Sequence, residues 1–213
     1  MKKVYLSSGA NPILTEYLKA RGYEISFVYP VPPVYAPVNS HPDIYMCRMS
    51  RHKIFRGKPE KLRRDYPGDA LYNAVCIGEY FIHNLKITDT GLLREARVSG
   101  MRLIDVPQGY TKCNMVVVDD GAAVTSDRGI ANALKDTDID LLVVSPGHVL
   151  LNGFPYGFLG GASGRVGDEL IFHGNLSGHP DFGRIVAFLK KRECKFKYFN
   201  QFELEDIGSI IEA

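Results

Sequence analysis

Cys113 directly follows a lysine in the segment Tyr110-Thr111-Lys112-Cys113-Asn114. A thiolate is the nucleophilic form of cysteine, and an adjacent ammonium lowers the pKa of the thiol when the two side chains converge. Neighbours on a strand point to opposite faces, so Lys112 assists Cys113 only if the strand has not begun there. Cys113 is therefore a candidate nucleophile, and the alternative is a free thiol that packs as a small hydrophobe.

Two His-Pro-Asp triplets could supply a paired imidazole and carboxylate. His41 and Asp43 follow a proline-rich stretch, 30–42, and we expect them at the entrance of a strand. A carboxylate there can orient the ring or bind a cationic substrate, so catalytic and structural roles both stay open for this pair. The second triplet, 179–181, is expected to open a helix and to act as a simple cap.

Two further segments carry candidate site residues. His148 follows a buried strand and is either a base or a histidine satisfied at a strand end. The segment 160–167 contains G-A-S-G-x-x-G, but a strand-like stretch follows it where a dinucleotide site needs a helix, so we expect no nicotinamide cofactor. Its glycines are expected to let the backbone turn or approach a ligand. The four cysteines form no C-x-x-C pair, so neither a metal nor a cofactor is expected.

The charge distribution is uneven. The 48–64 segment carries +7, and the remaining 18 basic and 23 acidic residues carry −5. Such a basic segment attracts phosphate-rich partners such as RNA, and a solvated loop is the alternative. Its eight cations are Arg48, Arg51, Lys53, Arg56, Lys58, Lys61, Arg63 and Arg64.

The elements that must position these residues recur along the chain. A helix from Asn11-Pro12 to Gly22 lies between strands at 4–6 and 25–29. Three later copies each read as a hairpin of strands, a helix and a closing strand. They cover 73–106, with a helix from 88–89 to 98; 114–145, with a helix from 126–127 to about 135; and 163–199, with a helix from 180–181. Asp120-Gly121 is typical of a type I′ turn, in which both residues have positive φ.

A fourth, weaker copy covers 41–55, with a turn near Met49-Ser50, and the N-terminal elements with the C-terminal tail furnish a fifth. The pattern predicts an α/β fold, as a closed propeller of five pseudosymmetric hairpin-helix-strand units in a single domain, 1–213. An ordinary two-layer α/β sandwich with chance similarity is the alternative.

Three motifs carry a resemblance to a known family. S-H-P-D-I-Y-M-C, G-Y-T-K-C-N-M-V-V-V-D-D-G-A-A-V-T-S-D and G-F-L-G-G-A-S-G-R-V-G-D-E-L-I-F-H-G-N-L resemble an uncharacterised bacterial family assigned the pentein, or guanidino-group-modifying-enzyme, fold. Catalytic penteins hydrolyse or transfer guanidino groups through a cysteine, a histidine and carboxylates. The resemblance implies that Cys113, His41 and Asp43 are catalytic. Substrate-binding residues would then be Lys112, Asn114, His148, Gly160, Gly161 and Ser163.

This sequence departs from the catalytic members, whose cysteine lies near the C-terminus. The last cysteine here, Cys194, lies in a lysine-rich strand. The fold also includes a ribosome anti-association factor without an enzymatic site. Two hypotheses follow: a cytoplasmic enzyme acting on a guanidino or amidino C–N group, or a non-catalytic protein that binds RNA, the ribosome or another acidic partner through 48–64. We expect no signal peptide and no membrane span.

Overall fold

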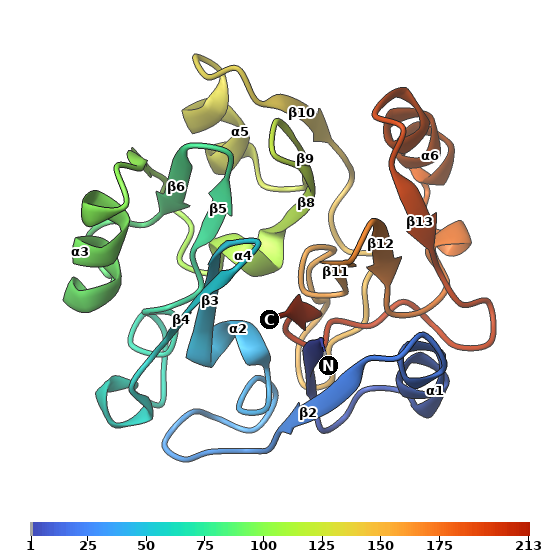
Figure 1. Ribbon diagram of the computed structural model, residues 1–213, viewed down its shortest axis with the longest axis horizontal. Helices are drawn as coiled ribbons and strands as arrows, with labels where there is room; N and C mark the ends of the chain where they lie inside the picture. Colours follow the sequence, from blue (N-terminus) through green and yellow to red (C-terminus); the bar gives the residue numbers. More distant parts are fainter. Residues whose placement is uncertain (1) are drawn as a thin grey trace.

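The computed structural model describes residues 2–213, which form five small β-sheets; the helices α1, α3, α5 and α6 lie on the outside, and the short helices α2 and α4 lie near the middle (Figure 1). Sheets that follow one another along the chain lie next to one another around the middle of the molecule, where the C-terminal strand lies. The structure is thus of the mixed α/β class that the sequence predicts. No helix within residues 2–213 is both long and apolar enough to cross a bilayer.

The N-terminal unit forms as its sequence predicts. Strands β1 (Lys3–Ser7) and β2 (Glu24–Val28) pair in parallel, and helix α1 (Pro12–Ala20) connects them. The helix begins where the Asn11 side chain accepts a hydrogen bond from the Ile13 amide, and it buries Leu14 and Leu18. Strand β14 (Ile211–Glu212) pairs with β1 in antiparallel orientation, which confirms the expected contribution of the C-terminal tail.

Three sheets repeat one arrangement. In each, two antiparallel strands form a hairpin, and a helix leads to a third strand that is parallel to the second. This pattern confirms the three predicted copies. They are β5 (Val75–Ile77), β6 (Tyr80–His83), α3 (Thr90–Val98) and β7 (Arg102–Asp105); β8 (Met115–Asp119), β9 (Ala122–Thr125), α5 (Arg128–Leu134) and β10 (Asp140–Val143); and β11 (Ser163–Val166), β12 (Glu169–Phe172), α6 (Phe182–Lys191) and β13 (Lys195–Lys197).

The weaker copy is a hairpin alone. Strands β3 (Met46–Ser50) and β4 (Lys53–Arg56) pair in antiparallel orientation, with the turn at Arg51-His52, two residues later than predicted. The 3₁₀ turn η1 (Pro59–Lys61) and irregular chain follow, in place of a helix and third strand. Another short 3₁₀ turn, η2 (Leu176–Gly178), precedes α6.

Three local expectations are wrong. Neither Asp120 nor Gly121 has a positive φ, because a register shift in the β8–β9 pair changes the turn, so it is not type I′. Asp43 lies in a short helix, α2 (Pro42–Tyr45), and the strand begins only at Met46. Helix α6 begins at Phe182, and the Asp181 carboxylate bonds to the Ser145 amide and Arg184 rather than capping the helix through its side chain.

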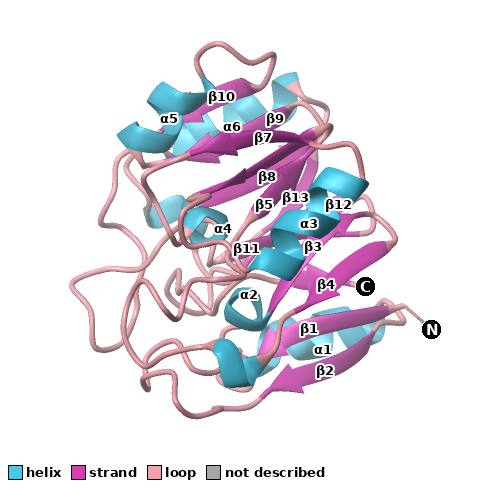
Figure 2. Ribbon diagram, turned by 90° about the vertical axis from the view of Figure 1, so that its left-hand side faces the viewer, coloured by secondary structure: helices cyan, strands magenta, loops and turns pink. Residues whose placement is uncertain are grey.

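The first strands of the sheets pack side by side in the middle of the molecule. Strand β3 contacts β5, β5 contacts β8, β8 contacts β11, and β11 contacts β14. Long connecting loops gather at one end of these strands, and the C-terminus lies toward the other end (Figure 2). Apolar residues of neighbouring sheets fill the space between strands and helices. Val116, Leu170, Phe172 and Ile185 are fully buried in the largest of these clusters.

The contact between β11 and β14 allows a test of this packing. A Cβ atom on Gly164 would lie 1.9 Å from the Ile210 carbonyl oxygen, whereas one on Gly183 in α6 meets nothing within 4 Å. We therefore expect Gly164→Ala to lower the free energy of unfolding by about 1–3 kcal/mol, the usual cost of overpacking. The matched control Gly183→Ala is expected to raise it by up to about 1 kcal/mol, because alanine favours helix. Urea unfolding of both variants measures the difference, and equal stabilities would contradict the packing.

Candidate functional site

Cys113 lies in the short helix α4 (Thr111–Asn114), immediately before β8. The Asn73 side chain, just before β5, holds this turn: its Oδ1 accepts hydrogen bonds from the amides of Lys112, at 2.8 Å, and Cys113, at 3.2 Å. Its Nδ2 also donates to the Cys113 Sγ, at 3.3 Å. Because the strand has not begun at Lys112, the condition for this lysine to share the site with Cys113 is met.

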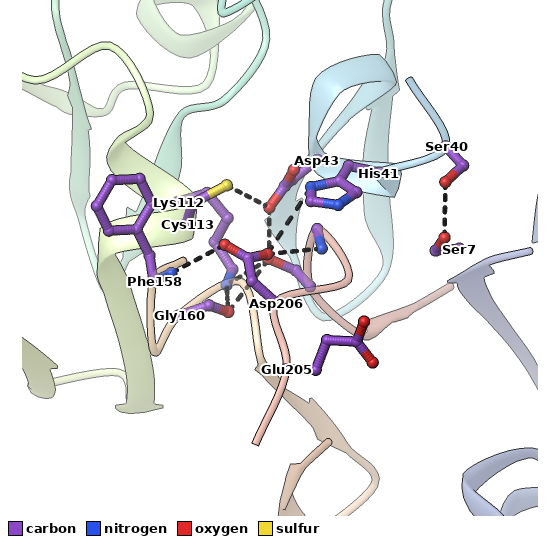
Figure 3. A network of polar contacts seen from close by, with 12 residues as sticks. Ser7, Ser40, His41, Asp43, Lys112, Cys113, Phe158, Gly160, Glu205 and Asp206 are labelled. Atoms are coloured by element: carbon purple, nitrogen blue, oxygen red, sulfur yellow. Dashed lines mark hydrogen bonds and ion pairs between the residues drawn. The ribbon is translucent and has the colours of Figure 1, made fainter. Parts of the chain in front are cut away.

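The Asp43 carboxylate joins three distant segments. Its Oδ2 accepts hydrogen bonds from the Cys113 thiol, at 3.1 Å, and from the Ser209 hydroxyl, at 2.6 Å. Lys112 Nζ donates to Ser209 Oγ, at 3.0 Å, and to the Gly160 carbonyl, at 3.1 Å. A chain of hydrogen bonds thus runs from the ammonium through the serine to the carboxylate and the thiol (Figure 3).

His41 and Asp206 complete this arrangement. His41 Nδ1 lies 3.8 Å from Asp206 Oδ1, and both side chains are buried. The amides of Phe158 and Gly208 each donate to the Asp206 carboxylate, at 2.9 Å. The neighbouring Glu205 points away from the cluster in Figure 3. We refer to His41, Asp43, Cys113 and Asp206 as the central cluster.

A small pocket of about 110 Å³ opens above the central cluster. His41, Cys113 and Asp206 contribute its polar lining. The rest of its lining is aromatic or aliphatic and comes from the proline-rich stretch, the segment 151–158 and Tyr110. These residues are Tyr35, Val38, Ile44, Tyr110, Leu151, Phe154, Tyr156 and Phe158. Phe154 and Tyr156 are partly exposed, so they lie where the pocket meets solvent.

Two side-chain atoms of the central cluster are buried without any hydrogen-bond partner. They are His41 Nδ1 and Asp43 Oδ1, and only Asp69 Oδ1 shares this property among residues 2–213. Buried polar atoms are nearly always hydrogen-bonded, and leaving one unpaired costs about 1–3 kcal/mol. His41 lines the small pocket, so a ligand there can pair with it, whereas Asp43 is fully buried and is not part of the lining.

Gly160 and Gly161 support the site through close approach. A Cβ on Gly160 would lie 2.5 Å from the Lys112 carbonyl oxygen, and one on Gly161 would lie 2.0 Å from Asp206 Oδ1. The Gly161 amide donates to the Cys113 carbonyl, at 2.8 Å. The glycines were expected to let the backbone turn or approach a ligand. In the structure, the backbone at Gly160 and Gly161 does make a close approach, and the groups that it approaches are Lys112, Cys113 and Asp206 of the protein itself.

Three predicted site residues lie elsewhere. His148 is exposed and packs against His179, with ring centroids 5.3 Å apart, so it is not placed to act as a base on Cys113. The Ser163 hydroxyl is buried and bonds to the Gly160 carbonyl. The Asn114 side chain donates to the Tyr110 carbonyl within its own turn. None of the three lines the small pocket.

Burial controls the protonation of the central cluster. It raises the pKa of the Cys113 thiol well above its usual value, and the carboxylates of Asp43 and Asp206 add to this rise. Lys112 therefore does not activate the thiol as the sequence predicted, and burial lowers the pKa of its own ammonium. Burial also lowers the pKa of His41 to about 4 and raises that of Asp206 to about 6. The resting site holds a neutral imidazole and a protonated thiol at neutral pH.

Asn73, Asp206 and Ser209 were missed by the sequence analysis. Asn73 and Ser209 lie two residues before β5 and β14, as Cys113 does before β8, and Asp206 lies slightly further from its strand. The sequence signal for Asp206 and Ser209 was their position just before the apolar C-terminal strand, on either side of Ile207-Gly208. The repeat was recognised, but its strand entrances were not compared residue by residue.

Internal contacts neutralise much of the basic segment 48–64. Arg48, Lys53 and Lys61 pair with Glu212, Glu95 and Asp89, and the guanidinium of Arg56 lies over the Tyr5 ring. Within residues 2–213, five cations of the segment have no ion pair: Arg51, Arg56, Lys58, Arg63 and Arg64. The described residues contain no group of three or more His, Cys, Asp or Glu placed to hold a metal ion.

The fold and the site together define a mixed α/β protein with a buried thiol, imidazole and carboxylate cluster below a small pocket. The chain belongs to a family of unknown function, DUF6873, whose model matches residues 53–211. Searches of the curated proteins and of the solved structures each found no match.

The raised pKa of Asp206 predicts a pH-dependent effect of removing its charge. A folded-state pKa of about 6, against the ordinary 3.8, means that the folded protein holds this proton more tightly than the unfolded chain. Stability from Asp206 is therefore lost as pH rises from about 4 to about 6, by about 3 kcal/mol in total. We expect the stability of Asp206→Asn, relative to the parent protein, to rise by about that amount over this range.

Urea unfolding across the pH range measures this difference. Asp120→Asn, on the exposed β8–β9 turn, is measured alongside it as the same carboxylate-to-amide change outside the site. A pH-independent difference between Asp206→Asn and the parent protein would contradict the assignment of a raised pKa to Asp206.

Proposed function

We propose that the chain is a pentein-like α/β propeller whose five units place their strand entrances around one site. The ordered contacts from β3 through β14 support this proposal. Tyr5, Met46 and Ile211 form an apolar cluster between the first and last units, and Arg48 of β3 pairs with Glu212 of β14. Each unit also contributes to the site or its support. The contributors are His41 and Asp43; Asn73; Lys112 and Cys113; Gly160 and Gly161; and Asp206 and Ser209.

We further propose that the protein is a hydrolase that cleaves a C–N bond of a small guanidino or amidino cation through Cys113. The observation that carries this proposal is the convergence of Cys113, His41 and Asp206 in one pocket, with Asp43 bonded to the thiol. A guanidinium offers several N–H donors in a plane, and the Asp206 carboxylate, which lines the pocket, is a suitable acceptor, with the buried Asp43 carboxylate close by on the thiol. The thiol then lies beside the electrophilic carbon.

The substrate's charge provides the activation that Lys112 does not. Burial and two carboxylates hold the Cys113 pKa high in the free protein. A cation placed between Asp43 and Asp206 cancels their effect and favours the thiolate. The nucleophile therefore forms only when the correct ligand is bound, which limits reaction with other electrophiles.

The reaction balances with water as the only co-substrate. His41 accepts the thiol proton as Cys113 attacks the guanidinium carbon, and the tetrahedral adduct then expels an amine or ammonia, which takes that proton from His41. The thiouronium intermediate that remains is attacked by water, and His41 accepts the water proton. Expulsion of the thiolate releases a urea or ureido product, or an amide from an amidine.

The pocket lining favours a small substrate with an apolar substituent. No lysine or arginine lines the small pocket, so it offers no cation to a substrate carboxylate. Its aromatic and aliphatic walls are suited to an alkyl or aryl group. The alternative of an RNA or ribosome partner rests on the cations of 48–64, and it has weaker support because internal pairs neutralise several of them.

Alkylation of Cys113 by an amidine reagent tests the nucleophile. We expect chloroacetamidine to alkylate Cys113 roughly tenfold faster than the neutral chloroacetamide, because one charge-assisted hydrogen bond contributes about 1.5–3 kcal/mol. Peptide mass spectrometry locates and times the adduct. In Asp206→Asn, the ratio of the amidine rate to the amide rate should fall toward one, and this ratio is free of the change in the Cys113 pKa that loss of the Asp206 charge causes in both rates. Equal rates for the two reagents in the parent protein would contradict the proposal.

Substrate selection tests the pocket chemistry. Ammonia or amine release from N-methylguanidine and N-benzylguanidine is expected to exceed release from L-arginine, because the pocket offers no partner to the α-carboxylate. Cys113→Ser should remove the activity, and Cys194→Ser, at a cysteine outside the small pocket, should retain it. A preference for L-arginine would overturn the assignment of an apolar substrate.

A further inference from the structure

A second, larger cavity lies at the opposite end of the central strands. It has a volume of about 540 Å³ and shares no lining residue with the small pocket. The small pocket takes its lining mainly from residues that precede β3, β8, β11 and β14. The large cavity is lined by residues within or just after β3, β5, β8, β11 and β14. Its volume lies in the range of about 300–1,000 Å³ that small-molecule sites occupy.

Cations outnumber acids in the lining of the large cavity. Arg48 of β3, Arg51 of the β3–β4 turn and Arg165 of β11 reach it from different segments, together with Lys112. The charges of Arg165 and Arg51 act on the Arg48 guanidinium and help to lower its pKa, after the larger effect of burial. This mutual repulsion is consistent with three guanidinium groups gathered in one place.

Internal partners compensate these charges only in part. Arg48 pairs with Glu212, and of the two acidic residues in the lining, Asp119 is bound by Arg192 through two hydrogen bonds. Asp120 is the other acid, and it is exposed on the β8–β9 turn. Arg51 makes no side-chain hydrogen bond or ion pair with any residue of 2–213. Lys112 Nζ already has three protein acceptors, so it contributes charge rather than a free donor.

We propose that the large cavity binds a small multivalent oxyanion, held by the guanidinium groups of Arg48, Arg51 and Arg165. A guanidinium binds phosphate and carboxylate oxygens through paired N–H donors, and Arg48 and Arg165 are partly fixed in position by bonds to backbone carbonyls. The ligand therefore carries phosphate groups or several carboxylates. This inference does not depend on the thiol chemistry, because the two pockets share no lining residue and none of the three arginines belongs to the central cluster.

Calorimetric titration with two probes tests the proposal. We expect pyrophosphate, citrate or both to bind the parent protein with one site per chain, and the affinity to fall as sodium chloride is raised. Tighter binding of pyrophosphate identifies a phosphate ligand, and tighter binding of citrate identifies a carboxylate ligand. Absence of saturable binding by either probe overturns the proposal.

Paired variants locate the binding. Arg51→Ala is expected to lower the affinity for the probe about tenfold, and Arg165→Gln is expected to lower it at least as much. Lys58→Ala removes an exposed cation of the same basic segment that does not line the cavity, and its affinity should stay within about twofold of the parent's. If Arg165→Gln does not fold, the comparison of Arg51→Ala with Lys58→Ala still tests the cavity site. An equal loss of affinity in these two variants would show that the anion binds the basic surface, and the cavity site would be rejected.

Discussion

A buried carboxylate without adequate partners is costly, and this constraint shapes the centre of the molecule. Asp43 has no exposed surface, and its Oδ2 receives the Cys113 thiol and the Ser209 hydroxyl, which come from segments far apart in the sequence. Those donors are in position only because α2, α4 and the C-terminal segment meet at the starts of three central strands. Loss of α4 or of the C-terminal segment would remove one of the two donors to Asp43.

The same arrangement separates two chemical environments along the central strands. At their starts, the small pocket combines the Asp206 carboxylate and the neutral His41 with apolar walls, and it has no lysine or arginine in its lining. At their ends, the large cavity gathers arginines from three segments. Lys112 lies between the two, because it neighbours Cys113 in sequence, bonds to Ser209 and lines the large cavity. The fold can thus present a site for a cation at one end and a site for an anion at the other.

Local signals allowed much of the fold to be predicted. Asn11-Pro12, Asp89 and Asp127 cap or begin their helices as expected, because capping depends on a few neighbouring residues. The prediction of a type I′ turn at Asp120-Gly121 was wrong, because a register shift between β8 and β9 changes the backbone conformation at the turn. The convergence of His41, Asp43 and Cys113 followed from the repeat and the family resemblance.

The energetics of the site could not be predicted in the same way. Lys112 was expected to lower the Cys113 pKa because the two are adjacent in sequence, but Asp43 and Asp206, distant in sequence, have the opposite effect in a buried setting. Asn73 and Ser209 act through single hydrogen bonds that only the tertiary structure defines. His148 was misplaced because a position after a strand does not specify which end of the sheet faces the centre.

The ultraviolet absorbance of the Cys113 thiolate tests the central claim most directly. The spectrum of Cys113→Ser is subtracted from that of the parent protein at neutral pH, so that the other cysteines cancel, and acetamidinium is then added. The account predicts no thiolate signal in the free protein and a saturable signal as the cation binds. A thiolate already present without ligand, or none at saturating acetamidinium, would contradict it.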